Sequence, residues 1–573
     1  MLKIKKLYTE PGVFDPISFV DGFNLILGEK KEGNVKTNGV GKSIVIEFLN
    51  YALLKQHKDS RVALIPEQTL SREVTVCLDF EIGEHKITSK RTIKDHDCPV
   101  LIINGHSQRY STLADANNHL GSLLFENLDQ KNPPSFRIMM GPLIRDEGSE
   151  FKSIIDCYDT TKRIPPDYTP HLYLLHVDPL PYNEARQLYK EMENLTKAKS
   201  KIEENIKVIT NKNVSESKSD LNELESQVRR IQSDIDRLEN IEGFGVIKDE
   251  IIEIENRLER ERSKQAVLKS ELSKLQLFHG DNYIDGDEVA ELYNQFKEGL
   301  GDLIKRELDE VTIFKKKIDN FQRNLIDQKR GSIVEALQPL NENISELSRL
   351  YKEKILLLDQ EGLLISLKQT IAIHARKIEE LSALSSFIKA HNQYESDHKS
   401  KKRERENKIY LLESYRNDSD AVVRSFEKTI LDIHEYVFGN RKSSFDIEIS
   451  KRKEILKFEL RTDSDGSHSI NREKVFLYDY ALLINPYTSE LHPGLLVHDN
   501  IFDVDQDTLI KSINYIGENL NLLNGKQYIL TINRDKFSES DMELLNLDLD
   551  GYARASFTKS NKFLKTQYQE LTL

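Results

Sequence analysis

The chain has 573 residues, 31% of them charged, and a formal net charge of −13. This length exceeds a single hydrophobic core and predicts several folding units, while the charge excludes a chain that is basic throughout but leaves room for a local basic face that meets nucleic acid. The three cysteines, Cys77, Cys98 and Cys157, lie far apart, and no run approaches the about 20 apolar residues of a membrane span, so we expect a reducing cytoplasm and neither disulfides, a zinc site nor a membrane segment.

The first strong motif is a glycine-rich loop between an expected strand and an expected helix. Residues 23–27 form a short apolar run that predicts a strand, and residues 44–54 predict an apolar helix. Between them, residues 38–43 read Asn-Gly-Val-Gly-Lys-Ser, the ending of a phosphate-binding loop. In such a loop, backbone N–H groups at the helix N-terminus surround the phosphates of a nucleotide, Lys42 reaches the outer phosphates and the Ser43 hydroxyl holds Mg²⁺.

The loop is longer than usual. The standard spacing has a glycine at position 36, where this chain has Lys36, and the first glycine after the strand is Gly28. Residues 29–35 therefore look like an insertion. Because Gly-x-Gly-Lys-Ser also occurs by chance in long proteins, an ordinary glycine-rich turn is the alternative interpretation.

The rest of the N-terminal part predicts half of an α/β nucleotide-binding domain with an added antiparallel layer. Residues 2–8 largely alternate apolar and polar side chains, as a half-buried strand does. Residues 74–93 predict a hairpin with Gly83 in the turn, and residues 98–105 predict another strand and turn. Residues 136–151 end in a polar, glycine-containing loop.

The period changes over residues 183–437, which predict a segmented coiled-coil arm. Apolar residues step by three and four from Leu221 to Ile241 and again from Leu337 to Tyr351, with charged residues between them, and this repeat is typical of a left-handed supercoil. Because both ends must return to one place, we expect an antiparallel hairpin whose tip lies between about 280 and 365; a plain helical bundle is the alternative. Glycine-containing breaks interrupt the repeat at residues 243–245, 280–286, 299–301 and 362.

Signals of α/β structure resume over residues 438–573. Residues 445–460 predict two strands, and the polar Ser/Gly stretch 463–469 opens a helix, which is an anion site. Residues 493–499 predict an apolar strand that ends in an aspartate, the geometry in which an aspartate holds Mg²⁺ through water. Residues 527–533 predict a further buried strand with a polar tip.

In this order the pieces resemble the split ATPase head of the SMC family, an α/β ABC-type head split by a long antiparallel α-helical coiled-coil hairpin. The resemblance divides the chain into an N-terminal half-head (1–182), the coiled-coil arm (183–437) and a C-terminal half-head (438–573). More narrowly, the chain resembles the SMC-like ATPases of bacterial three-component antiphage systems of the Lamassu type. The motifs that carry this narrower resemblance are residues 36–43, 145–151 and 498–503.

The resemblance implies ligands for ATP and Mg²⁺. Asp499 would be the Mg²⁺ aspartate, and Asn533 would take the place of the switch histidine. No glutamine stands where ABC-type ATPases place one near Mg²⁺ and the γ-phosphate, so Arg145, Asp146 and Glu147 are the polar candidates, with Glu147 expected at the metal. The residues that would bind phosphate and Mg²⁺ are Asn38, Gly39, Gly41, Lys42 and Ser43. The residues that would stand in the signature loop and cap the ATP of a second protomer include Ser464, Gly466 and Ser467.

The departures from the family concern hydrolysis. The family normally has a glutamate after the Mg²⁺ aspartate, to orient the attacking water, and this chain has Asn500. An amide is not a general base near neutral pH, so we expect catalysis at Asp499 and Asn500 to be slow or to use another acid, Asp503 or Glu147. Asp503 and Asp505 would belong to the loop that crosses the dimer interface.

The function implied is that of a cytoplasmic, ATP-binding subunit that forms an ATP-sandwiched homodimer in an antiphage complex. It would sense foreign double-stranded DNA or DNA ends and control an effector, a nuclease or another hydrolase, together with a small accessory subunit. The alternatives are a DNA-repair ATPase of the RecN or SMC-nuclease type and a structural coiled-coil scaffold. The basic runs 315–317 and 399–405 could line a DNA path or be solvated helix faces with acidic partners.

Overall fold

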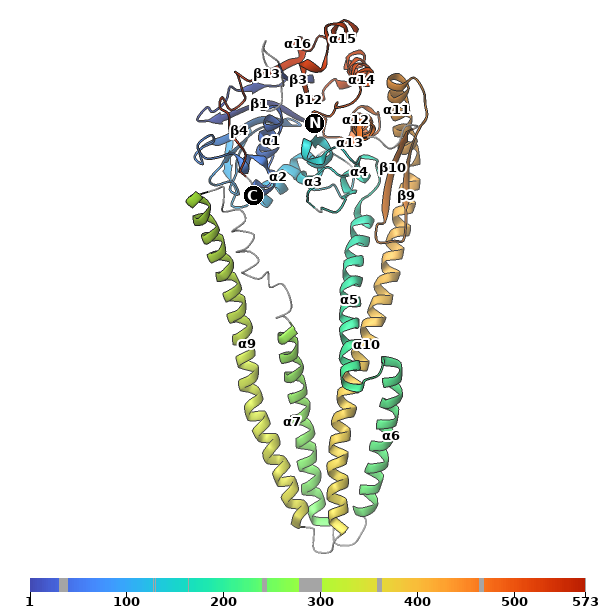
Figure 1. Ribbon diagram of the computed structural model, residues 1–573. Coiled ribbons are helices and arrows are strands. Elements are labelled where there is room, and N and C mark those ends of the chain that lie inside the picture. The colour runs from blue at the N-terminus through green and yellow to red at the C-terminus, as the bar shows by residue number, and fades with distance from the viewer. Residues whose placement is uncertain are drawn as a thin grey trace. The chain divides into compact units, whose positions relative to one another are not determined.

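The computed structural model describes residues 1–29, 40–126, 128, 130–162, 164–239, 245–277, 301–357, 363–462 and 468–571. The chain divides into two compact units. One, here called the head, consists of Met1–Lys197 and Glu395–Leu573, so both ends of the chain belong to it (Figure 1). The other, here called the arm, consists of Ala198–Tyr394. In the part of the chain that is described, no helix is long and apolar enough to cross a membrane.

The head is built on a five-stranded parallel sheet in the order β13-β3-β12-β11-β8. Strand β3 comes from the N-terminal part of the chain and lies between two C-terminal strands, so neither half-head can form this sheet alone. Strands β3, β11 and β12 are buried almost throughout, as expected of parallel strands covered on both faces. The strands are β3 (Gly22–Gly28), β8 (Ile144–Arg145), β11 (Leu495–Asp499), β12 (Gln527–Asn533) and β13 (Ala553–Phe557).

The predicted antiparallel layer is a second, six-stranded sheet in the order β2-β1-β4-β5-β6-β7. Burial alternates along β1, because successive side chains point to opposite faces of a strand. Gly83 turns the β4–β5 hairpin with a φ of 58°, in the left-handed region that favours glycine. The strands are β1 (Leu2–Glu10), β2 (Ile17–Ser18), β4 (Thr75–Ile82), β5 (His85–Thr92), β6 (Val100–Ile103) and β7 (His106–Arg109). A separate two-stranded ribbon pairs β9 (Ser443–Ile449) with β10 (Leu456–Thr462).

Helices complete the core of the head. Helix α1 follows β3, and α12 is buried along most of its length, with the Tyr478 ring packed against Phe426 of α11 at 5.3 Å between ring centroids. The strands predicted at residues 23–27, 493–499 and 527–533 and the helix predicted at residues 44–54 are thereby confirmed. The head helices are α1 (Lys42–Ala52), α2 (Leu113–Leu124), α3 (Phe136–Leu143), α4 (Thr169–Leu174), α11 (Asp420–Phe438), α12 (His468–Ile484), α13 (Thr488–Leu491), α14 (Gln506–Glu518), α15 (Glu539–Leu544) and α16 (Leu549–Tyr552).

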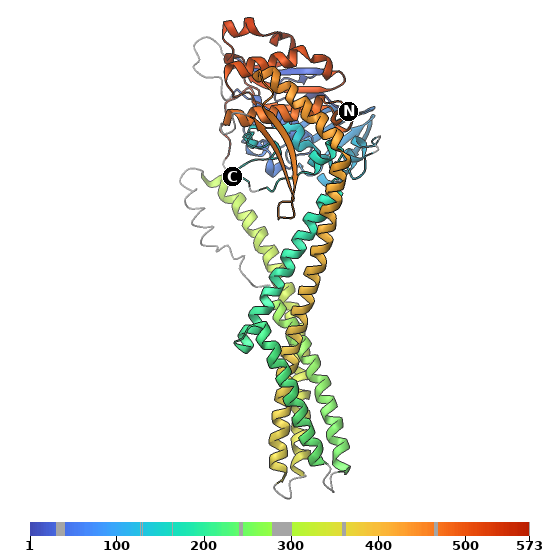
Figure 2. The same cartoon turned by 90° about the vertical axis from the view of Figure 1, so that its right-hand side faces the viewer.

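Two long helices leave and re-enter the head, α5 (Leu180–Thr210) and α10 (Leu363–Asp418). Their head portions lie side by side in both views (Figures 1 and 2) and run in opposite directions. Glu184 of α5 pairs with Lys408 of α10 at 2.7 Å. Seven residues later on α5, Glu191 pairs with Lys401, which lies seven residues earlier on α10, at 3.1 Å. Lys399 and Lys401 of the basic run 399–405 therefore have acidic partners, Glu395 and Glu191. This agrees with the interpretation of the run as a solvated helix face and not as a DNA path.

The arm contains the remaining helices, α6 (Val214–Glu239), α7 (Gly245–Leu277) and α9 (Gly301–Leu357). Helices α7 and α9 pair in opposite directions, because Glu250 contacts Lys354 while Gln265, further along α7, contacts Asn341, which is earlier in α9. The arm is therefore an antiparallel coiled-coil structure. Helices α7, α9 and α10 begin at Gly245, Gly301 and Leu363, next to the breaks predicted at 243–245, 299–301 and 362. The other residues of these breaks, and the whole break at 280–286, lie outside the described residues, and the side chains of the basic run 315–317 are not described.

One break in the arm has no glycine. Helix α5 ends at Thr210 and α6 begins at Val214, with Asn211 in the left-handed region at a φ of 54°. Asn213 and Glu216 then form a reciprocal pair: the Glu216 N–H donates to Asn213 Oδ1 at 2.9 Å, and the Asn213 N–H donates to Glu216 Oε2 at 3.3 Å. This reciprocal arrangement is a capping box, which provides hydrogen-bond acceptors for N–H groups that have no partner at the start of a helix. Beside it, Ile206, Leu384 and Ile388 form a small buried cluster.

Candidate functional site

The carboxyl ends of the parallel strands meet at one edge of the head sheet. There the strand ends Gly28 and Asn533 are direct neighbours, and Asp499 pairs with Thr531 of the same strand as Asn533. Glu147 follows β8, which borders β11 on its other side. Ligands of open α/β sheets bind at this edge. The structure thus brings together polar residues that are separated by hundreds of positions in the sequence.

Helix α1 begins at this edge with a glycine. Gly41 is its N-cap, at a φ of 106°, and provides no side chain to cap the N–H groups of the first turn. A Cβ at this position would lie 2.7 Å from the Cβ of Phe563, so the left-handed backbone and the close approach both require glycine. The uncapped N–H groups and the helix dipole together favour an anion at the start of α1.

Lys42 is the first residue of α1 and is buried, at 8% exposure. Its ammonium donates a hydrogen bond to Oδ1 of Asn533. The two side chains meet over Gly28, where a Cβ would lie 2.7 Å from the Asn533 oxygen and 2.9 Å from the lysine nitrogen. Burial lowers the pKa of Lys42, against the opposite effect of Asp499 and Glu147. A buried ammonium of this kind is stabilised by a further anion.

Asp499 ends β11 and is completely buried. Its Oδ1 accepts a hydrogen bond from the Thr531 hydroxyl at 2.6 Å, and the Ser43 side chain lies near enough to lower the pKa of this carboxyl. Its Oδ2 finds no hydrogen-bond partner in the described part of the chain. Burial, followed by the nearby charge of Glu147, raises the pKa of Asp499 to about 7. An orphaned carboxylate oxygen beside a hydroxyl fits a divalent cation, which would favour the ionised form.

The donor set suits Mg²⁺ held partly by phosphate and water. Over the ranges that the structure describes, no group of three or more His, Cys, Asp or Glu side chains is arranged to hold a metal. Mg²⁺ in nucleotide sites characteristically takes only one or two protein ligands, with substrate phosphates and waters completing the shell. Ser43 and Asp499 would be those ligands, and the cation would neutralise charge on the phosphates.

Asn500 follows Asp499 in a left-handed backbone conformation, with a φ of 56°. Its N–H donates to Thr531 Oγ1 at 3.0 Å, and its carbonyl accepts from Arg472 at 2.9 Å. The side-chain Nδ2 donates to Glu147 Oε1 at 3.3 Å, whereas the buried Oδ1 has no partner among the described residues. A non-glycine residue held at positive φ costs energy, and such residues cluster at functional sites.

The three polar candidates after β8 have different surroundings. Arg145 points into the core, where it binds Asp479, so it is not a phosphate ligand. Asp146 caps the short 3₁₀ helix that follows, accepting from the Gly148 N–H at 3.0 Å, and lies 3.2 Å from the Lys55 ammonium. Glu147 alone of the three contacts Asn500.

The remaining predicted residues lie elsewhere or outside the description. Asp503 is 66% exposed and pairs with Lys536 at 3.3 Å. Asp505 is the N-cap of α14, and its carboxylate accepts a hydrogen bond from the Thr508 N–H at 3.2 Å, which stabilises the start of this helix. The residues that lie outside the described ranges are Asn38, Gly39, Ser464, Gly466 and Ser467.

Two site residues escaped the sequence reasoning. Thr531 receives the Asn500 N–H and donates to Asp499, so it sets the geometry of both residues. The available signal was one threonine between Leu530 and Ile532, just before Asn533. Arg472, which holds the Asn500 carbonyl, comes from the first turns of α12 and carried no local signal.

Part of the chain matches a family model, and nearly its whole length is similar to a bacterial protein. Residues 427–568 match a family described as "Uncharacterised protein conserved in bacteria (DUF2326)". The chain is 22% identical over 612 residues to "Uncharacterized protein YydD" of Bacillus subtilis (strain 168), with 94% of each chain covered.

Two solved structures of archaeal Smc head domains are also similar. One, with a coiled coil and joint, is from Pyrococcus yayanosii: TM-score 0.36, 13% identity, 95% of this chain and 94% of that chain covered. The other, with an extended coiled coil and bound to the C-terminal domain of ScpA, is from Pyrococcus furiosus: TM-score 0.32, 10% identity, 100% and 97% covered. Because both identities and both TM-scores are low, the function of this chain is inferred from its sheet order and its site residues.

Proposed function

We propose that this chain is an SMC-like ATP-binding protein whose head binds ATP with Mg²⁺ and hydrolyses it slowly. The observation that carries the proposal is the convergence of the buried Lys42 ammonium, the Ser43 hydroxyl and the orphaned Asp499 oxygen at the start of α1. This set offers a cation and helix N–H groups to phosphates and a carboxylate to a divalent metal, which is the combination that a nucleoside triphosphate requires.

Slow turnover follows from the residue after Asp499. Asn500 carries an amide, which does not accept a proton near neutral pH. Hydrolysis then depends on another carboxylate, and binding becomes the main use of ATP. We expect a turnover rate below about 1 s⁻¹, the lower end for ordinary enzymes.

The proposal extends to a homodimer that closes on ATP. The segment that includes Ser464, Gly466 and Ser467 precedes α12 and would cap the ATP of a second head, as the resemblance to SMC heads implies. The same resemblance supports the biological role: an ATP-gated subunit of an antiphage complex that senses double-stranded DNA or DNA ends and controls an effector and a small accessory subunit. A DNA-repair ATPase of the RecN or SMC-nuclease type is the second candidate, and the neighbouring genes distinguish the two, because a defence operon encodes its effector beside this chain.

Nucleotide binding by the full chain tests the core of the proposal. We expect Lys42→Ala to abolish binding of a fluorescent ATP analogue in the presence of Mg²⁺, because it removes the ammonium at the start of α1 that would meet the outer phosphates. Lys58→Ala is the matched control, since Lys58 is exposed in the short 3₁₀ helix His57–Asp59 that follows α1. Equal affinities for the two variants would leave a structural scaffold as the better interpretation.

A further inference from the structure

We propose that Glu147, oriented by Asn500, is the general base of ATP hydrolysis in this head. The proposal rests on the nucleotide-binding function proposed above and deepens it by naming the residue that replaces the missing glutamate. Of the two roles that the sequence suggested for Glu147, it assigns the acid at the attacking water and not the metal ligand.

The other carboxylates near Asn500 are committed to other contacts. Asp146 is bound by Lys55 and by the N–H of Gly148. Asp499 accepts from Thr531 and lies at the position suited to the cation. The carboxylate of Asp146 is therefore engaged elsewhere, and the unpartnered Oδ2 of Asp499 is assigned to the cation.

Asp503, the other acid that the sequence offered, faces away from this position. Its carboxylate pairs with Lys536, whose ammonium also donates to the Phe502 carbonyl at 2.7 Å, and 66% of the Asp503 side chain is exposed. Glu147 remains as the carboxylate that Asn500 contacts directly. Glu147 also lies close enough to Lys42 and Asp499 for its charge to raise the pKa of both groups.

Three hydrogen bonds hold Asn500 in place, two at its backbone and one at its side chain. Its backbone is fixed on both sides by Thr531 and Arg472, and its Nδ2 donates to Glu147. Its Oδ1 is buried and has no hydrogen-bond partner in the described ranges, so the contact that the Asn500 side chain makes there is the one with Glu147. An attacking water would donate one hydrogen to the exposed Glu147 carboxylate, leaving an oxygen lone pair for attack.

The step balances without any further reactant. The water oxygen forms a bond to the γ-phosphorus, the bond from that phosphorus to the β,γ-bridging oxygen breaks with its electron pair leaving on ADP, and one water proton passes to Glu147. The products are ADP and inorganic phosphate. Glu147 is exposed, so it can return its proton to solvent.

The experiment separates binding from turnover in the full chain. Glu147→Gln keeps shape and removes the base, and Glu150→Gln, an exposed glutamate of the same loop that pairs with Lys152, is the matched control. We measure affinity for a non-hydrolysable ATP analogue with Mg²⁺ and, separately, phosphate release in single turnovers. Glu147→Gln should retain affinity within about twofold and lose at least about 100-fold in phosphate release, the range of general-base catalysis. Glu150→Gln should match the wild type in both.

A second variant protects the test against an indirect effect. Adding Asn500→Glu to Glu147→Gln restores a carboxylate beside Asp499 and should recover phosphate release. Unchanged release in Glu147→Gln overturns the proposal, and so does a parallel loss of Mg²⁺-dependent affinity, which identifies a metal ligand. A wild type that binds ATP but releases no phosphate above the Lys42→Ala blank also overturns it, whereas failure of ATP binding itself contradicts the proposed function instead.

Discussion

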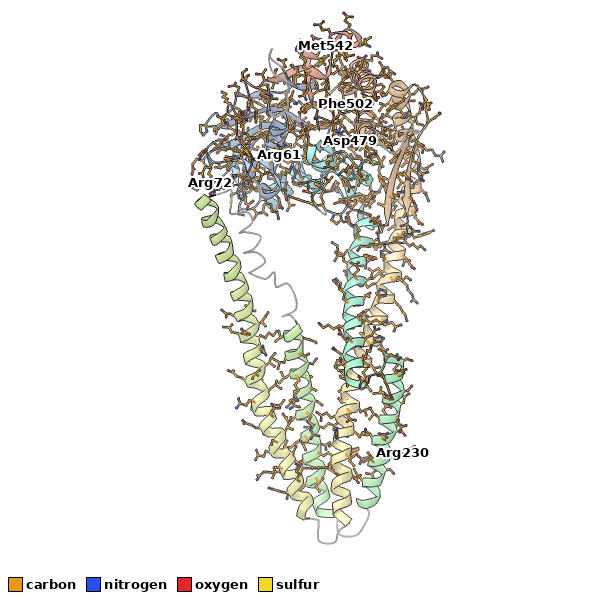
Figure 3. All side chains as sticks on the ribbon, in the orientation of Figure 1. Arg61, Arg72, Arg230, Asp479, Phe502 and Met542 are labelled. Carbon is orange, nitrogen blue, oxygen red and sulfur yellow. The ribbon has the colours of Figure 1, made fainter. Side chains whose placement is uncertain are left out.

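Arg145 and Asp479 form a bidentate ion pair in the interior of the head, with Nε to Oδ2 at 2.8 Å and the second guanidinium nitrogen to Oδ1 at 2.9 Å. Both side chains are almost inaccessible, at 0% and 1% exposure, and Figure 3 shows Asp479 inside the head. His498 lies 3.2 Å from the same carboxylate and 3.0 Å from the hydroxyl of Tyr528. Burial would raise the pKa of Asp479, but Arg145 and His498 hold it below its usual value.

This buried network lies next to the two segments that carry Glu147 and Asp499. Arg145 precedes the Glu147 turn and also donates to the carbonyls of Ser153 and Asp156, at 3.2 and 3.1 Å, so it holds the chain that follows the turn. Its partner Asp479 belongs to α12, and His498 immediately precedes Asp499 on β11. The ion pair therefore fixes the positions from which Glu147 and Asp499 reach the site.

Removal of one partner of this pair should be costly. We expect Asp479→Asn to destabilise the protein by about 3–5 kcal/mol in urea denaturation, because it leaves the Arg145 charge buried without compensation. Arg109→Ala is the control, since Arg109 and Asp95 form an exposed pair at 3.3 Å, and such a pair contributes about 0–1 kcal/mol. Equal effects of the two substitutions would contradict this account of the core.

Asp499→Asn should change how stability depends on pH and Mg²⁺. Because the folded pKa of about 7 lies above the unfolded value of 3.8, this carboxyl stabilises the fold below pH 4, and the contribution is lost as the pH rises through 7. We expect the variant to have a higher Tm than the wild type at pH 8 without Mg²⁺, with a smaller difference at pH 5. Mg²⁺ with nucleotide should raise the Tm of the wild type only, and a variant that responds equally would show that the cation binds elsewhere.

Glu473 provides a second, independent pH effect. It is buried on α12, accepts from the Ser512 hydroxyl at 3.1 Å, and burial raises its pKa to about 8. Since the folded pKa exceeds the unfolded value of 4.5, its stabilising contribution is lost as the pH rises through 8. Glu473→Gln should therefore be more stable than the wild type at pH 9 and differ little at pH 5, as followed by thermal unfolding. An identical pH dependence for both proteins would place Glu473 in contact with water.

Gly28→Ala should weaken nucleotide binding. Its Cβ would displace the Lys42 ammonium and the Asn533 amide from their meeting point, so we expect a loss of at least about tenfold in ATP affinity, or about 1.4 kcal/mol. Gly12→Ala is the control, because a Cβ there meets nothing within 4 Å. Unchanged affinity in Gly28→Ala would mean that Lys42 and Asn533 separate readily when ATP binds.

Local patterns explain why much of the fold was predictable. The apolar runs at residues 23–27 and 527–533 are buried strands in the structure, because parallel strands covered on both faces need continuous apolar character. Glycine-containing breaks lie next to the starts of α7, α9 and α10 in the described part of the arm, since glycine disfavours a helix interior. The break at residues 211–213 was missed because asparagine, not glycine, adopts the left-handed conformation there.

The sequence by itself determined the elements at whose ends the proposed site residues stand: Lys42, Ser43, Asp499, Asn500 and Asn533 each follow or end a recognisable strand or loop. Only the tertiary structure decided the partners of these residues. Arg145 and Glu147 are two positions apart in one polar loop, yet Arg145 is buried against Asp479, 334 residues away, while Glu147 is exposed beside Asn500. Local composition does not distinguish them, because the free energy of each side chain depends on charges that long-range sheet pairing brings near it.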